Sequence, residues 1–397
     1  MTAKKPRRCL CLILAWLLAF QLLPPAALAE EAAINVTVAT GSKEKSLAEI
    51  PVQWDTAWFT ADTSEYRQEL ALTALALSGA AYAQKGGSLC VQDALKALGF
   101  GKIKSYHYGV SSDIGDRTAY TFAVQKLKSA EGKPQYLIAV VVRGTGEYME
   151  WASNLRMGAG SEHIGFVRAE KELLANLKSY LTEIDGSLKF LITGHSRGGA
   201  VANLLAARLP EAGLAKREDI YAYTFAAPTV SAEVPEEGYG WIFNIVNEED
   251  LVTRVPLPAW GYRRYGIDLP LPVEHEGELF DAMNQQYKAL TDQDYAVYQD
   301  PNATDKLAEA IYRLAPTPTG TNMEMLAALF SGDLDGLSTL IEHNGIAALL
   351  LGRTALEVSS QLVPLIRQEQ AGMRSAHCVA GYYSWLSVTS SFPEANR

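Results

Sequence analysis

KFLITGHSRGGAVANLLAARL, the segment at residues 189–209, decides the fold of this chain. It begins with an apolar run, continues through a Gly-x-Ser-x-Gly turn and ends in an alanine-rich segment with helical spacing. A serine at the top of such a strand-turn-helix unit has a strained backbone, and its neighbours two positions away need to be small. Gly194 and Gly198 meet that need. The segment therefore predicts a nucleophile elbow at Ser196, lined by His195, in preference to a glycine-rich turn with an idle serine.

Strand-like and helix-like segments alternate on both sides of this elbow. Strands are expected at residues 119–127, 135–143, 220–225 and 241–246, and helices at residues 64–83, 91–98, 169–184 and 201–209. A turn-like segment joins the first two strands and predicts a hairpin, and the second of them is apolar enough to be covered on both faces. The alternation predicts an α/β fold, with a mostly parallel central sheet and helices on both faces.

Composition divides the chain into five segments. Residues 1–29 carry a basic start, an apolar run and an Ala-x-Ala end, which predict a secretory signal peptide, with an uncleaved anchor as the alternative. Residues 30–60 are polar and weakly patterned, so an extended and partly mobile segment is expected there. Residues 61–273 form the predicted core, and residues 274–373, rich in helix formers, a helical insertion or cap. Residues 374–397 form a short return segment.

The charge balance is acidic, with 35 basic and 45 acidic residues and a formal net charge of −10. Removal of the predicted signal peptide takes away four basic residues and makes the chain more acidic still. Such a chain is a poor candidate for binding nucleic acid or anionic lipid. Outside the signal peptide only Cys90 and Cys378 remain, and the sequence leaves open whether they form a disulfide or stay as buried thiols.

A serine nucleophile needs a histidine base and a carboxylate behind it. In α/β-hydrolases the order along the chain is serine, acid, histidine, and three histidines follow the elbow: His275, His343 and His377. His343 lies next to a glycine stop and fits a helix C-terminus. His377 lies in the return segment, where the fold needs its base, and is therefore the predicted one.

The acid should follow the strand at residues 241–246. Glu248, Glu249 and Asp250 supply three consecutive carboxylates there, and spacing alone does not choose among them.

Taken together, these motifs resemble the class 3 (fungal-type) lipase family of α/β-hydrolases. The motifs that match, in the family's order over about residues 119–256, are RGT at 143–145, HIGF at 163–166, GHSRGGA at 194–200, FAAP at 225–228 and NEEDLVTRVP at 247–256. His377 extends the match. The resemblance implies Asp250 as the acid and places the oxyanion hole at the backbone N–H groups of Thr145 and Arg197.

The resemblance also places a lid at residues 146–155, with Tyr148, Met149 and Trp151 as its candidate residues. The alternatives are an exposed amphipathic helix at the lid and an ordinary turn at residues 143–145.

Two departures bear on the substrate. Arg197 stands where the family usually has leucine, and its charge is expected to favour polar or anionic substrates. The interval between Asp250 and His377 is longer than in compact family members, so its helices are expected to cap the acyl site.

The resemblance thus implies a secreted serine ester hydrolase that cleaves carboxylic esters of lipids through an acyl-enzyme, at an interface in some cases. It implies no cofactor, catalytic metal or nucleic-acid partner, and no membrane span after signal cleavage, and leaves the oligomeric state open. The alternatives within enzymes are a phospholipase A1, a short-chain carboxylesterase and a serine peptidase. The alternative outside enzymes is a catalytically silent cell-surface or binding protein that keeps the fold.

Overall fold

The computed structural model describes residues 33–109, 117–128, 133–145, 162–235, 237–315, 360 and 364–392. Several expectations concern residues outside these ranges: the signal peptide at 1–29, the lid candidates Tyr148, Met149 and Trp151, the residue His343 and positions 316–359 of the helical insertion. The chain divides into two compact units, Met1–Ala33 and Ile34–Arg397. All the described helices and strands lie in the second unit.

The centre of this unit is a seven-stranded sheet in the order β11-β10-β9-β8-β7-β6-β5. Its strands are β5 Gly101–Tyr106, β6 Tyr120–Leu127, β7 Gln135–Val142, β8 Ser187–His195, β9 Ile220–Phe225, β10 Ile242–Val246 and β11 Ile267–Pro270. Neighbours from β7 to β11 run parallel, whereas β5, β6 and β7 are joined antiparallel. The predicted hairpin and the predicted mostly parallel sheet are both confirmed.

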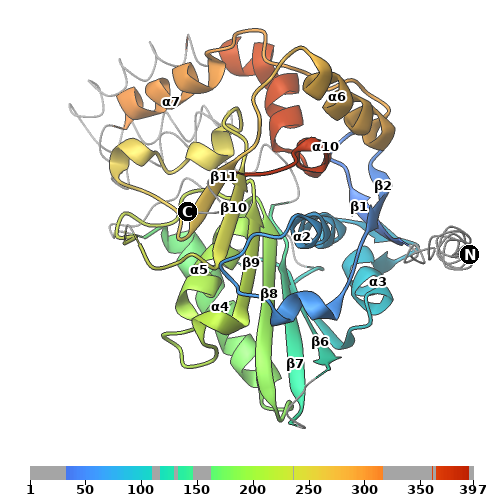
Figure 1. Ribbon diagram of the computed structural model, residues 1–397. Coiled ribbons are helices and arrows are strands. Elements are labelled where there is room, and N and C mark those ends of the chain that lie inside the picture. The colour runs from blue at the N-terminus through green and yellow to red at the C-terminus, as the bar shows by residue number, and fades with distance from the viewer. Residues whose placement is uncertain are drawn as a thin grey trace, which may run out of the picture. The chain divides into compact units, whose positions relative to one another are not determined.

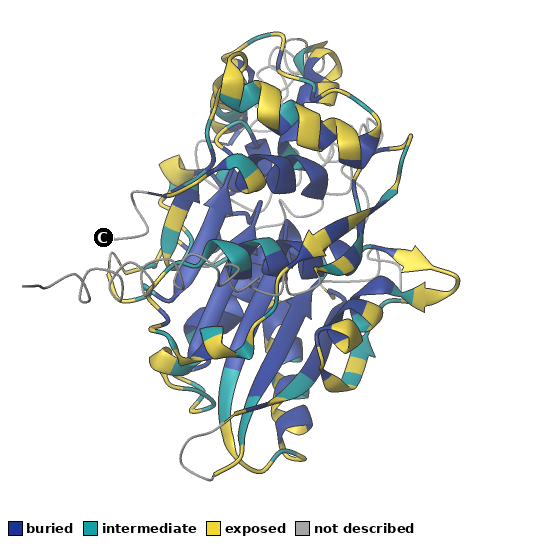
Figure 2. Cartoon of the chain, turned by 45° about the vertical axis from the view of Figure 1, so that its right-hand side comes forward, coloured by how far each residue is buried: buried dark blue, intermediate teal, exposed yellow. Residues whose placement is uncertain are grey.

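Helices cover both faces of the sheet (Figure 1). One face carries α2 Gln68–Ala80 and α3 Cys90–Ala97, and the other carries α4 Ile164–Leu181 and α5 Arg197–Arg208. The central strands β7 to β10 are buried except at the start of β7 and β8 (Figure 2), and residues 137–142 of β7 have no exposed surface. Burial on both faces explains why β7 is apolar without alternation. The α/β-hydrolase architecture expected from the sequence is therefore present.

The N-terminal region differs from the expectation of an extended, partly mobile segment at residues 30–60. It forms an antiparallel hairpin of β1 Ile34–Ala39 and β2 Leu47–Val52, followed by the 3-10 helix η1 Thr56–Thr60. Alternate residues of both strands, Val36, Val38, Ile50 and Val52, are buried in the same core as α2. The period of two in these short strands is a half-buried strand pattern, and it accounts for the ordered packing.

The remaining elements lie outside the seven-stranded sheet. They are β3 Gln84–Lys85, β4 Ser88–Leu89, the 3-10 helices η3 Arg217–Asp219, η4 Leu251–Arg254 and η5 Pro258–Trp260, and the helices α6 Glu278–Thr291, α7 Ala303–Leu314 and α10 Val379–Val388. Residues 364–377 are also helical, and α10 follows them after a break at Cys378. The helix α10 is buried against α2 and α6. The return segment thus contains the end of the helix at residues 364–377, which carries His377, and the buried helix α10.

Two further findings concern cysteine pairing and membrane insertion. Cys90 and Cys378 are both buried free thiols, so the disulfide that the sequence left open is not formed. Among the described helices, none combines the length and the apolar character that a bilayer span requires.

Candidate active site

Ser196 lies at the junction of β8 and α5 with a left-handed φ of 58° and a ψ of −134°. Its backbone N–H donates to the carbonyl of Phe225 at 2.9 Å. The two flanking glycines allow the close approach that this turn needs. A Cβ at Gly194 would lie 2.4 Å from the carbonyl oxygen of Gly198, and one at Gly198 would lie 2.3 Å from that of Val142. A larger residue at either position would force strand and helix apart.

Two hydrogen bonds connect Ser196 to the other predicted catalytic residues. His377 Nε2 lies 3.0 Å from Ser196 Oγ, and His377 Nδ1 lies 2.7 Å from Asp250 Oδ2. A carboxylate only accepts hydrogen bonds, so the Nδ1 atom carries the proton and Nε2 is left to accept from the serine hydroxyl. The structure therefore brings together the three residues that the sequence selected, in the order that a serine nucleophile requires.

Asp250 is almost completely buried, with 1% of its surface exposed. Its Oδ1 atom accepts the Val252 N–H at 3.0 Å at the start of η4, and its Oδ2 atom accepts the hydroxyl of Tyr382 at 3.0 Å. Burial and the adjacent carboxylate raise the pKa of Tyr382 well above its ordinary value, so the phenol keeps the proton it donates. These donors offset the cost of burying the carboxylate charge. Sequence analysis missed Tyr382, because no motif marks it.

The neighbouring carboxylates have other environments. Glu248 is exposed, and Glu249 Oε1 lies 2.7 Å from His275 Nε2. Spacing alone did not distinguish these two residues from Asp250, whereas in the fold it is Asp250 that contacts His377.

A buried arginine fixes the loop that carries Asp250. Arg264 Nη1 donates to the carbonyl oxygens of Thr253 at 2.6 Å and Ala227 at 2.8 Å. Arg264 also pairs with Asp268. These contacts connect the loops that follow β9 and β10, so the acid is held relative to the sheet rather than on a free loop.

The predicted oxyanion residues flank the elbow. Arg143, Gly144 and Thr145 follow β7 directly, and a Cβ at Gly144 would lie only 3.2 Å from the Ser196 Cβ. Arg197 is the first residue of α5, so its backbone N–H lies in the first turn of that helix. The guanidinium of Arg197 lies 5.8 Å from the centre of the Phe166 ring, at the start of α4.

The remaining predicted or nearby histidines have structural contacts. His163 Nδ1 accepts the Phe166 N–H at the start of α4, and His107 Nε2 lies 2.8 Å from Glu172. His195 is buried beside Ser196, between the hydroxyl of Tyr82 and the backbone of His377. Burial, together with the nearby His377, lowers the pKa of His195 to about 3, so its imidazole is neutral at physiological pH.

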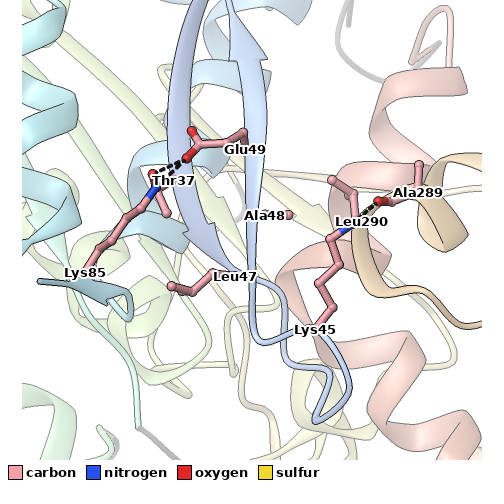
Figure 3. Close-up of a pocket in the computed structure, with 8 residues that line it drawn as sticks. All are labelled: Thr37, Lys45, Leu47, Ala48, Glu49, Lys85, Ala289 and Leu290. Atoms are coloured by element: carbon pink, nitrogen blue, oxygen red, sulfur yellow. Dashed lines mark hydrogen bonds and ion pairs between the residues drawn. The ribbon is translucent and has the colours of Figure 1, made fainter.

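A separate groove of about 470 Å³ lies between the β1–β2 hairpin and α6 (Figure 3). Its charged residues already have partners: Lys45 Nζ donates to the carbonyl of Ala289 at 2.7 Å, and Lys85 pairs with Glu49 at 3.3 Å. Its lining residues come from the hairpin, the β3 strand and α6, so this groove is distinct from the site around Ser196.

Residues 139–260 match the family model described as Lipase (class 3). Over this segment the chain is similar to the class 3 lipase family. The class 3 lipase segment includes Thr145, Ser196, Arg197 and Asp250, whereas His377 lies beyond it. The resemblance noted in the sequence motifs is thereby confirmed.

Two curated relatives align with the chain over part of their length. The secreted mono- and diacylglycerol lipase 1 of Fusarium solani is 33% identical over 141 residues, which are 32% of this chain and 41% of that protein. A lipase of Rhizomucor miehei is 29% identical over 161 residues, which are 34% of this chain and 42% of that protein. The chain thus spans about two fifths of the length of these relatives.

The chain is also similar to solved lipase structures. The crystal structure of a lipase from Rhizopus microsporus var. chinensis superposes with a TM-score of 0.39 and 20% identity, covering 56% of this chain and 78% of that one.

Proposed function

We propose that this protein is a serine hydrolase that cleaves carboxylic esters of lipids. The observation that carries the proposal is the hydrogen-bonded line from Asp250 through His377 to Ser196, built on a nucleophile elbow inside a class 3 lipase segment. The names of the two curated relatives, a mono- and diacylglycerol lipase and a lipase, support a lipid ester as the substrate.

In the acylation step, Ser196 Oγ attacks the ester carbonyl carbon while His377 Nε2 accepts the hydroxyl proton. The carbonyl π electrons move to the oxygen, and the backbone N–H groups of Thr145 and Arg197 stabilise the resulting oxyanion. The intermediate then collapses, the bond to the leaving alcohol breaks, and His377 gives its proton to that alcohol. The acyl group remains on Ser196.

In the deacylation step, water occupies the place of the alcohol. His377 accepts a proton from the water as its oxygen attacks the acyl carbon, and a second oxyanion forms in the same N–H pocket. Collapse releases the carboxylic acid, and the proton returns to Ser196 Oγ. Through both steps Asp250 holds the Nδ1–H tautomer of His377 and stabilises its charged form.

We place this activity outside the cell. The predicted signal peptide at residues 1–29 supports export, and the Fusarium relative is named as a secreted lipase. An acidic exported chain fits an uncharged ester at a lipid–water interface better than a polyanion.

The test is turnover of a series of p-nitrophenyl esters from acetate to palmitate, above and below the concentration at which each substrate aggregates. Ser196→Ala is expected to lose at least about 10⁴-fold in kcat, because the nucleophile is gone. Ser384→Ala removes a buried serine hydroxyl on α10 that donates to the carbonyl of Ala380, so it is the matched control and is expected to keep its activity.

Activity that depends on Ser196, grows with chain length and increases at the interface would support a lipase. Activity that depends on Ser196 but is confined to short dissolved esters would show that the substrate is a small soluble ester and not a lipid. Ester turnover unchanged in Ser196→Ala, or absent from the folded wild-type protein on both ester and phospholipid substrates, would contradict the proposal.

A further inference from the structure

A second chain of hydrogen bonds runs behind Ser196. Gly144 N–H donates to the hydroxyl of Tyr82 at 3.1 Å, and that hydroxyl lies 3.1 Å from His195 Nδ1. On the other side of the ring, His195 Nε2 lies 2.8 Å from the carbonyl oxygen of His377. This series of hydrogen bonds therefore connects the loop at residues 143–145 to the backbone of His377, two segments that lie far apart in the sequence.

The direction of each hydrogen bond follows from the partners. The carbonyl of His377 only accepts, so His195 Nε2 carries the ring proton. Because the pKa of His195 is lowered to about 3, Nδ1 carries no second proton at neutral pH and accepts from Tyr82. Burial raises the pKa of Tyr82, which keeps its proton, and this proton also faces the carbonyl of His195 at 3.1 Å.

The rings around His195 leave it little freedom. Tyr82 and Tyr382 both meet the His195 ring edge-on with centroids 5.8 Å away, and the His377 ring lies 5.1 Å away. A neutral imidazole in this cage offers one donor and one acceptor on opposite sides, and both are used. An apolar side chain of similar size would fill the space but would make neither connection.

We propose that Tyr82 and His195 are positioning residues, which hold the oxyanion loop at residues 143–145 and the backbone of His377 at fixed distances from Ser196. This inference rests on the proposed function. Tyr82 restrains the loop by accepting the Gly144 N–H, one residue before Thr145, the residue proposed for the oxyanion hole. His195 restrains the backbone of His377 through its carbonyl, so that the His377 imidazole stays next to Ser196.

Removing a hydrogen bond from this series is expected to lower kcat rather than substrate affinity, because the contacts orient groups that act in the transition state. Tyr82→Phe removes a single oxygen and leaves the Gly144 N–H without its acceptor. The expected result is a fall in kcat for p-nitrophenyl butyrate of about 10- to 100-fold, with KM within about twofold of wild type.

Tyr223→Phe is the matched control. Its hydroxyl also accepts one backbone N–H, that of Arg67 at 3.2 Å, and Tyr223 lies on β9 in the buried core that includes α2. The two variants therefore lose the same kind of hydrogen bond, and Tyr223→Phe is expected to keep its kcat. Rates are divided by the amount of Ser196 that reacts with an organophosphonate, so loss of folded protein does not count as loss of rate.

Variants of His195 distinguish its hydrogen bond to Tyr82 from its hydrogen bond to the His377 carbonyl. In His195→Gln the amide nitrogen can take the place of Nε2 and donate to the His377 carbonyl, whereas His195→Ala offers no donor. The expected order of kcat is wild type, then His195→Gln, then His195→Ala, at similar KM.

Three outcomes decide the matter. A fall in kcat for Tyr82→Phe no larger than for Tyr223→Phe, or equal kcat values for His195→Gln and His195→Ala, would overturn the positioning role. A rise in KM at unchanged kcat would instead make Tyr82 a substrate-binding residue. The proposed function fails separately, if wild-type turnover does not depend on Ser196 in the same assay.

Discussion

Two histidines flank Ser196, and the comparison between them shows how their surroundings divide their work. His377 stands between the serine hydroxyl and the buried carboxylate of Asp250, with 12% of its side chain exposed. His195 is the residue next to Ser196 in sequence, and it stands between a phenol and a backbone carbonyl. The rings are only 5.1 Å apart. A carboxylate behind one ring supports a positive charge there, whereas the other ring contacts no anion among the described residues and stays neutral.

Burial also contributes to this difference between the two histidines, because it lowers the pKa of His195. Desolvation is the main cause of the low pKa of His195, and the nearby His377 lowers that pKa further. A neutral His195 adds no charge beside the serine when His377 becomes protonated during turnover.

The largest effect is expected from Asp250→Asn, which removes the anion and makes the surroundings of His377 resemble those of His195. Because the amide no longer stabilises the charged imidazole or enforces its tautomer, kcat is expected to fall about 10³- to 10⁴-fold with little change in KM. Steady-state kinetics on p-nitrophenyl butyrate measures both kcat and KM of this variant. Asp305→Asn, at an exposed ion pair with Arg254, is the control. Full activity in Asp250→Asn would remove this residue from the site.

The next effect concerns stability in acid. The pKa of His195 is about 3 in the folded protein and near 6.5 when unfolded, so the unfolded chain binds an extra proton between these values. The stability contribution is therefore complete above about pH 6.5 and is lost as the pH falls toward 3. In His195→Gln, the slope of the unfolding free energy against pH is expected to decrease by about 1.4 kcal/mol per pH unit in this window.

Urea denaturation at several pH values between 4 and 7 measures that slope in the two proteins. Parallel slopes would mean that His195 is protonated in the fold, and the contrast with His377 would be lost.

The smallest effect is expected from Tyr382→Phe, which removes one of the donors to Asp250. The carboxylate keeps its contacts with His377 and the Val252 N–H, so a fall in kcat of only about 10-fold is expected. Tyr180→Phe removes a hydroxyl that donates to the carbonyl of Lys102, far from the site, and should leave kcat unchanged. A loss as large as that of Asp250→Asn would give Tyr382 a role of its own in the chemistry.

Much of the sheet was predictable from the sequence, because its signals are local. Strand β8 and helix α5 follow from one apolar run and one alanine-rich run on either side of a glycine turn, and β7, β9 and β10 follow from apolar segments. The residues proposed as nucleophile, base and acid also meet in the structure, although spacing alone did not distinguish Asp250 from its two neighbours.

What the sequence did not predict depends on contacts between distant segments. The β1–β2 hairpin has only a short alternation in each strand, and its packing on α2 decides its order. Tyr82 and Tyr382 lie on core helices or at their ends, where an aromatic residue indicates packing. Their hydroxyls gain a role only because the fold places a backbone N–H beside one and a carboxylate beside the other.

The adduct formed by diethyl p-nitrophenyl phosphate on the full chain identifies the nucleophile directly. Mass spectrometry of the digested protein is expected to find one phosphoryl group per molecule, on the peptide that contains Ser196. The label should be absent from Ser196→Ala and should form far more slowly in His377→Ala and Asp250→Asn. A folded protein that hydrolyses esters without carrying a label on Ser196 would show that Ser196 is not the nucleophile. Labelling that is equally fast in His377→Ala would show that His377 is not its base.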